Sequence, residues 1–382
     1  MTAKLEILSS FPTAEKFYSD FWNRRPFVVK GALEAGLVES LITAEELAGL
    51  SLEEDVRSRL VTGPDGGWLC THGPFEEEAF NELGERGWNL LVHNVERYHP
   101  PVADLLPLFD FSPRWLLDDI MVSYSVPGGS VGPHIDSYHV FLVQGQGRRR
   151  WKVGADPLRN EEYIPDIDLR VLKDGFEGTT VDVEAGDVIY IPPQVPHEGV
   201  TAESALTFSI GFLGPSLPEL FMAYGQYLEA EERSSERFLG ACLTEADSGF
   251  SISKNAVGQI RDLMRRGLET GDFGEWLVTY FSEPSVDEDF SDSVCPDVLA
   301  YFGQDRSLVR PQQDKLVILQ VSDNRRVVGY GGRSFRIAEK NAPLLHRLES
   351  GRKIAEKDLD SLDRTDEMLL LLENILAAAD GN

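Results

Sequence analysis

Two short segments of the chain carry side chains that could together bind one metal ion. His134 and Asp136 lie two residues apart, and on an extended strand this spacing places both side chains on the same face. His197 follows the segment Asp187 to Pro196, in which a strand-like run leads into prolines that would fix the turn before the imidazole. We therefore expect His134, Asp136 and His197 to be the ligands of a single ion.

The donor set indicates which metal and which chemistry to expect. Two histidines and one carboxylate form the facial triad of non-haem Fe(II) oxygenases, whose open positions accept an oxoacid and dioxygen. Zinc is more often four-coordinate, with nitrogen or sulfur ligands. A His-x-Asp pair alone is usually a surface hydrogen-bonding pair, but the second segment, within a strand-rich region, favours metal binding. His139 is five residues from His134, so on a continuous strand it would face away from the metal. The remaining histidines have no partner at ligand spacing and are interpreted as structural or solvated: His72, His93, His99 and His346.

A cation is expected on the buried face of one strand. In the run Arg148 to Val153, period-two alternation places Arg149 on the same face as Trp151 and Val153, and the other cations on the opposite face. A buried cation is costly unless it is paired, and a guanidinium presents a fork that suits a carboxylate. Arg149 is therefore predicted to bind the distal carboxylate of 2-oxoglutarate. The alternative is an internal ion pair with an aspartate or glutamate.

Small polar side chains on neighbouring expected strands could hydrogen-bond the same cosubstrate. They alternate with apolar residues and are Ser123, Ser125, Thr207 and Ser209. Asp118 and Asp119, just before the first of these strands, could pair with a substrate guanidinium. Capping or solvation is the alternative for both aspartates.

The elements that must position these residues can be read from the periodicity. Between Asp110 and Leu213, short apolar runs separated by glycine and proline turns predict a β-sandwich or barrel. The segments Leu217 to Glu232, Asn255 to Leu268 and Phe273 to Phe281 have helical spacing. The acidic stretch Ser282 to Asp292 indicates a linker or exposed loop, and the mixed strands and helices beyond it could form a winged helix.

Composition limits the classes of protein to consider. The chain has 382 residues, 42% of them hydrophobic, which predicts a globular protein of two or three domains. A net charge of −28 makes direct DNA or RNA binding improbable. This acidity could attract a basic partner, or it could reflect solubility or a salty habitat. Three cysteines are too few for a disulfide framework or a thiolate metal site, so packing is expected for Cys70, Cys242 and Cys295.

Targeting signals are not indicated. No stretch approaches the roughly 20 apolar residues that span a bilayer. The first residues carry no signal-peptide core, so a cytoplasmic location is expected.

Several of these segments resemble the JmjC cupin oxygenases, and within them the bacterial ribosomal oxygenases that hydroxylate an arginine of large-ribosomal-subunit protein sixteen. The resemblance covers about the first 215 residues. Its motifs are Phe21 to Pro26, Gly73 to Phe75, Ser123 to Gly129, Val131 to His134, Gln144-Gly145 with Gly147 to Trp151, and Ile191 to Pro193 with Pro196 to Gly199.

The resemblance implies a mixed α+β fold: a JmjC/cupin double-stranded β-helix, then a helical dimerisation domain, then a small winged-helix-like domain. The corresponding ranges are 1–214, with the oxygenase core at about 92–213, then 215–282 and 283–382. It assigns the iron to His134, Asp136 and His197, and the 2-oxoglutarate carboxylate to Arg149.

The implied activity is that of a dioxygenase that uses Fe(II), 2-oxoglutarate and O2 to hydroxylate an arginine side chain of a ribosomal protein, with succinate and CO2 as coproducts. The partners expected are a basic ribosomal protein and a second copy of the chain, with no membrane or nucleic acid. Two alternatives stay open. The same chemistry could act on another protein or a small molecule, or the chain could be a cupin that binds metal without catalysis.

Overall fold

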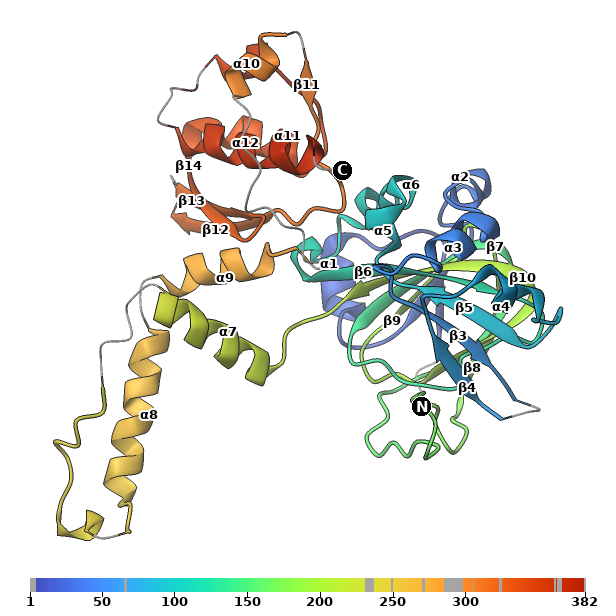
Figure 1. Cartoon of the computed structure of the whole chain (residues 1–382), viewed down its shortest axis with the longest axis horizontal. Helices are drawn as coiled ribbons and strands as arrows, with labels where there is room; N and C mark the ends of the chain where they lie inside the picture. Colours follow the sequence, from blue (N-terminus) through green and yellow to red (C-terminus); the bar gives the residue numbers. More distant parts are fainter. Residues whose placement is uncertain are drawn as a thin grey trace. The chain divides into compact units, whose positions relative to one another are not determined.

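The computed structural model describes residues 5–64, 67–230, 237–248, 250–269, 272–284, 298–304, 306–322, 325–360, 362 and 366–380 (Figure 1). The chain divides into two compact units, Met1–Gly214 and Pro215–Asn382. Most of the predicted linker and Cys295 lie outside the described residues. None of the described helices is both long and apolar enough to cross a bilayer.

The first unit is built on one large sheet. Nine strands follow the order β1-β2-β9-β7-β10-β6-β5-β3-β4, and β8 pairs with β7. Every pairing is antiparallel except that between β1 and β2. The strands are β1 (Glu6–Leu8), β2 (Phe27–Val29), β3 (Ser58–Thr62), β4 (Leu69–His72), β5 (Trp88–Val92), β6 (Leu117–Ser125), β7 (His139–Gly154), β8 (Gly178–Glu184), β9 (Val188–Ile191) and β10 (His197–Phe212).

Two apolar runs that the sequence suggests are separate strands form the single strand β7. The intervening glycines, which resemble a turn signal, instead allow close packing within the sheet. A Cβ on Gly145 would lie 2.4 Å from the Phe208 ring, and Gly147 has φ +68° beside the Ser204 carbonyl. The register between β7 and β10 shifts beside them, between Glu203 and Thr207. This irregularity is a β-bulge, which glycine accommodates without interrupting the strand.

Strand β7 separates two apolar clusters because its side chains alternate between faces. Phe141 and Val143 belong to a phenylalanine-rich core beneath the N-terminal helices, whereas Val140 and Leu142 belong to a second cluster. Helices gather along one side of the sheet (Figure 1). The helical segments are α1 (Ala14–Lys16), η1 (Phe17–Phe21), α2 (Ala35–Glu39), α3 (Ala44–Leu50), α4 (Glu77–Asn81), α5 (Val95–Tyr98), α6 (Pro100–Ala103), η2 (Leu106–Phe109) and η3 (Arg114–Leu116).

The second unit combines helices with two small antiparallel sheets. Strands β12, β13 and β14 form one sheet, and β11 pairs with β15. Its elements are α7 (Leu217–Ala230), η4 (Glu245–Asp247), α8 (Lys254–Leu268), α9 (Phe273–Phe281), α10 (Val298–Phe302), β11 (Ser307–Leu308), β12 (Val317–Ser322), β13 (Arg325–Tyr330), β14 (Arg333–Ala338), η5 (Glu339–Asn341), α11 (Ala342–Glu349), β15 (Ile354–Ala355), η6 (Glu356–Leu359) and α12 (Glu367–Asp380).

Alternation along β13 places this sheet between two apolar clusters. Val327 packs with Val278 of α9, whereas Val328 packs in the cluster that contains α11 and α12. Glu275 of α9 also forms ion pairs with Arg325 and Arg336. Helix α9 therefore packs on the β12-β13-β14 sheet. The division into a helical dimerisation region and a winged-helix-like domain remains a prediction.

Candidate metal and cosubstrate site

A β-bridge of two backbone hydrogen bonds brings the two candidate histidine ligands together. The N–H of His134 donates to the carbonyl of His197 at 3.0 Å, and the N–H of His197 donates to the carbonyl of His134 at 2.9 Å. The ring centroids lie 4.2 Å apart. The expectation that His134 and Asp136 lie on a regular strand was wrong, because only His134 pairs, in this isolated bridge. The bridge between the two segments, and not a continuous strand, therefore positions the histidine side chains.

The donor atoms of the three residues converge. One ligand atom from each of His134, Asp136 and His197 lies within 4.8 Å of the others. Each imidazole places Nδ1 beside a backbone carbonyl, at 2.9 Å from Gly132 O for His134 and 3.0 Å from Val195 O for His197. A proton held on Nδ1 by these contacts leaves the Nε2 lone pair available to a metal.

The protonation states also suit metal binding. Burial, reinforced by the nearby His197, lowers the pKa of His134 to about 4, so its ring is neutral at neutral pH. Burial alone would raise the pKa of Asp136. The contact with His197 Nε2 at 3.4 Å and the nearby His134 outweigh burial, and the net pKa of Asp136 is lowered. A neutral imidazole and an ionised carboxylate are the forms that ligate metals.

Arg149 is the buried cation of this region, with 3% of its surface exposed. Its guanidinium donates to Ser123 Oγ at 3.4 Å, Thr207 Oγ1 at 3.3 Å and the Gly199 carbonyl at 3.3 Å. It also lies 5.0 Å from the Trp151 ring. Burial lowers the pKa of Arg149 to about 10, so it is protonated at neutral pH.

The neighbouring cations differ from Arg149 in exposure and in partners. Arg148 and Arg150 are exposed and form ion pairs with Glu203 and Asp182. Within the described part of the chain, no aspartate or glutamate forms an ion pair with Arg149. This result argues against the alternative of an internal salt bridge and leaves the guanidinium suited to an anionic ligand.

The candidate ligands and Arg149 line one cavity of about 310 Å³, a size typical of small-molecule sites. Four buried polar atoms on its walls have no hydrogen-bond partner among the described residues. They are Arg59 Nε, Asn89 Oδ1, Arg149 Nε and Trp151 Nε1. Because buried polar groups are normally paired, these atoms fit a polar ligand better than an apolar one, and the three N–H donors among them suit an anion.

The four predicted hydroxyl residues take different positions. Ser123 and Thr207 contact Arg149, and Ser123 and Ser209 line the cavity. Ser125 instead accepts a hydrogen bond from Thr201 Oγ1 at 2.7 Å. Sequence reasoning missed other lining residues, including Arg59, Asn89, Tyr138 and Arg170, because they lie on separate strands and loops without a recognisable motif.

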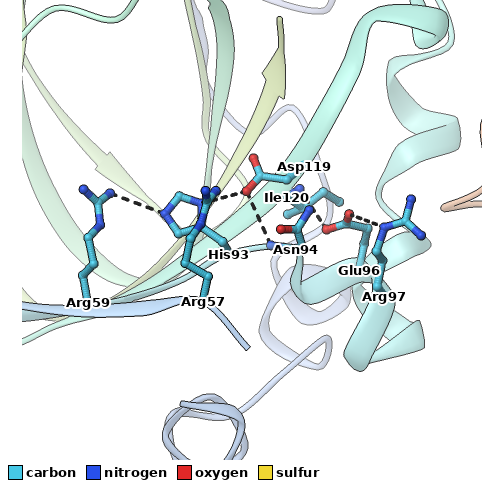
Figure 2. Close-up of polar contacts among 8 residues, drawn as sticks. All are labelled: Arg57, Arg59, His93, Asn94, Glu96, Arg97, Asp119 and Ile120. Atoms are coloured by element: carbon cyan, nitrogen blue, oxygen red, sulfur yellow. Dashed lines mark hydrogen bonds and ion pairs between the residues drawn. The ribbon is translucent and has the colours of Figure 1, made fainter. Parts of the chain in front are cut away.

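Asp119, one of the two candidate substrate aspartates, has partners within the protein. Asp119 Oδ2 lies 2.9 Å from His93 Nδ1 and accepts from the Asn94 N–H at 3.4 Å. His93 Nε2 in turn lies 3.4 Å from a guanidinium nitrogen of Arg59, so the three side chains form a chain of contacts that ends at the cavity wall (Figure 2). This agrees with the interpretation of His93 as structural. Asp118 is half-buried on β6.

Comparisons with known proteins agree with this geometry. The JmjC domain model matches residues 104–220. Over 269 residues the chain is 37% identical to the Escherichia coli ribosomal protein uL16 3-hydroxylase, covering 70% of each protein. A probable ribosomal oxygenase of Haemophilus influenzae is 40% identical over 210 residues, which are 54% of this chain and 51% of that protein.

Solved structures extend the similarity to both units. The X-ray structure of E. coli YcfD has a TM-score of 0.79 and 31% identity, covering 95% of this chain and 96% of that one. YcfD in complex with cobalt and 2-oxoglutarate has a TM-score of 0.75 and 31% identity, covering 96% of each chain. Fold and site therefore define a JmjC-type 2-oxoglutarate oxygenase, which confirms the predicted fold class. Within this class, the chain belongs to the ribosomal oxygenase family.

Glu96 is a buried carboxyl group that lies near Asp119 and Asn94. Glu96 accepts a hydrogen bond from the Ile120 N–H at 2.9 Å and lies 3.9 Å from Arg97 Nε (Figure 2). Burial raises the pKa of Glu96 to about 7 from its usual 4.5. Between these two pH values the native chain holds a proton that the unfolded chain has lost. This group therefore makes unfolding easier as pH rises through that window.

Glu96→Gln should remove this penalty, because the amide oxygen can still accept from Ile120 but never ionises. We expect its stability gain over the unmodified protein to reach up to about 3 kcal/mol at about pH 8, and to be about 2 kcal/mol smaller at about pH 5.5. Urea unfolding at both pH values measures this gain. The exposed Glu39→Gln should show no such dependence, and a pH-independent difference for Glu96→Gln would contradict the assignment.

Proposed function

We propose that the chain hydroxylates an arginine side chain of a large-subunit ribosomal protein, using Fe(II), 2-oxoglutarate and O2. The observation that carries the proposal is the presence in one cavity of three converging metal donors and a buried Arg149 without a carboxylate partner. The relative named as a uL16 3-hydroxylase supports the choice of substrate. An acidic chain also favours encounter with a basic protein.

The residues present fit the cofactors, and each can be given a role. His134, Asp136 and His197 would hold the iron, which supplies the oxidative chemistry when bound. Arg149 would bind the distal carboxylate of 2-oxoglutarate, with Ser123 and Thr207 orienting the guanidinium. Ser209 lines the same cavity and could hydrogen-bond the ligand, whereas Ser125, held by Thr201, is the weaker candidate.

Substrate positioning would fall to the apolar part of the cavity wall. Met121, Val140 and Leu142 provide apolar walls that would contact the aliphatic part of a side chain. Neither aspartate lines the cavity, and Asp119 is engaged by His93, so a guanidinium contact for Asp118 or Asp119 is the weaker part of the proposal. The same oxygenase chemistry on another protein or a small molecule is the alternative. With a ribosomal substrate, we expect the reaction to occur in the cytoplasm.

His134→Ala or Asp136→Ala should abolish 2-oxoglutarate turnover while the fold survives, because each removes one of three ligands. Succinate formation under Fe(II) and oxygen measures the loss, and circular dichroism checks the fold. Removal of iron by a chelator should stop turnover, and Fe(II) but not Zn²⁺ should restore it. Full activity in either variant, or activity with zinc alone, would refute the mechanism.

Arg149→Ala should weaken 2-oxoglutarate binding by roughly 2 to 5 kcal/mol, the cost of leaving a desolvated carboxylate without its cation. Arg148→Ala, a neighbour of the same charge on the exposed face, is the matched control and should change binding little. Calorimetric titration of 2-oxoglutarate into each variant compares the two. Equal losses of 2-oxoglutarate affinity in the two variants would show that binding does not depend on the buried face of β7.

We also propose that the chain forms a homodimer through region 215–282, as predicted. Two helices of this region expose apolar side chains: Leu217, Phe221 and Met222 on α7, and Val257, Ile260, Met264 and Leu268 on α8. On α8 these recur at helical spacing, so they form a stripe that an isolated unit leaves in water. The helical spacing of this segment predicts one exposed stripe of Leu217, Leu220, Phe221, Tyr224 and Leu228. That prediction is wrong at Tyr224, which is buried against Phe273 and Trp276.

Phe221→Glu combined with Ile260→Glu should give a folded monomer, because charges in an apolar interface oppose association. Light scattering reports the mass, and circular dichroism the fold. Tyr224→Glu is the contrasting variant and should unfold the second unit, because its ring is internal. A monomeric mass for the unmodified chain at micromolar concentration would eliminate the dimer.

A further inference from the structure

A second group of metal-binding side chains lies away from the candidate iron ligands. Cys70 and His72 of β4 and Asp168 of the loop after β7 each place a ligand atom within 4.8 Å of the other two. His72 Nε2 lies 2.7 Å from Asp168 Oδ2 and 4.0 Å from Cys70 Sγ. The sequence interpretation gives His72 a structural or solvated role and Cys70 a packing role, and the fold adds a carboxylate beside both. Asp168 is distant in sequence, so spacing could not show the group.

The arrangement of the donors indicates a metal site rather than a nucleophile. In a catalytic Cys-His-Asp relay, the thiol and the carboxylate contact opposite nitrogens of the imidazole. Here both Cys70 Sγ and Asp168 Oδ2 approach the same nitrogen, Nε2 of His72. Three donors of different kinds thus surround one point. A thiolate, an imidazole and a carboxylate are all ligands of zinc.

The group lies at the rim of the cavity that holds the candidate iron ligands. His72 pairs with Arg59, and Cys70 pairs with Val61, in the β3–β4 ladder. Directly paired residues project to the same face of a sheet, and Arg59 and Val61 both line the cavity. The neighbours of Asp168 in sequence, Leu169 and Arg170, line the same cavity from the loop.

We propose that Cys70, His72 and Asp168 bind a Zn²⁺ ion that fastens the loop bearing Leu169 and Arg170 to strand β4. Three protein ligands leave one position for water, as in other open zinc sites. The side chains of His72 and Asp168 are 55% and 75% exposed, so the ion has direct access from solvent. The consequence is a cavity rim whose order depends on zinc and not on iron.

Cobalt is the most direct probe, because a thiolate bound to Co²⁺ gives an intense near-ultraviolet charge-transfer band that histidine and carboxylate ligands lack. Titration of the reduced full-length chain with Co²⁺ should produce this band, and added Zn²⁺ should abolish it. Cys70→Ser should lose the band, whereas Cys242→Ser should retain it. His72→Ala and Asp168→Asn should weaken Co²⁺ binding at this site at least roughly tenfold, the lower end of what loss of a supporting partner costs.

A band that is missing from the unmodified chain, or that persists in Cys70→Ser, would overturn the site. Hydrogen exchange tests the structural consequence, since the amides of residues 163–172 should exchange more slowly with zinc than without it. Unchanged exchange would refute the fastening of the loop. Neither measurement depends on the proposed hydroxylation, because the band reports only thiolate coordination and the exchange requires no turnover.

Discussion

The site depends first on the reciprocal backbone bridge between His134 and His197. Its two hydrogen bonds join a loop before β7 to the start of β10, so the imidazoles approach one point although they are far apart in sequence. Local carbonyls then set the orientation of each ring, because Gly132 and Val195 lie at hydrogen-bonding distance from the Nδ1 atoms. Main-chain contacts, which substitution of side chains does not remove, therefore fix the directions of the metal ligands.

The second constraint is the cost of keeping Arg149 in the interior. Neutral oxygens from two strands, β6 and β10, surround its guanidinium, and the exposed arginines on either side are the ones with carboxylate partners. A carboxylate beside Arg149 would stabilise the fold but would also compete with an anionic ligand. The proposed ligand-binding role would account for the absence of a carboxylate partner for Arg149, whereas Arg148 and Arg150 on the outward face have such partners.

Much of this could be predicted from the sequence, because several signals are local. Alternation along β7 separates Arg149 from Arg148, and the apolar runs from Leu117 to Phe212 indicate most strands of the core. Long-range geometry could not be predicted in the same way. The bulge at Gly147 resembles a turn, β13 has a weak pattern, and Asp168 approaches His72 only through the path of a loop. Tyr224, which has the spacing of an exposed stripe, packs inside its own unit because α9 supplies aromatic partners.

The proposed role of Arg149 would couple folding to ligand binding, because its buried guanidinium has only hydroxyl and carbonyl partners. A protonated guanidinium that lacks a counterion destabilises the native chain, and an oxoacid carboxylate that binds only the folded state offsets that cost by mass action. The population of unfolded molecules, which proteases attack, then falls as the oxoacid accumulates. On the proposed role of Arg149, the same buried charge would set both how tightly the enzyme holds its cosubstrate and how long the folded chain persists.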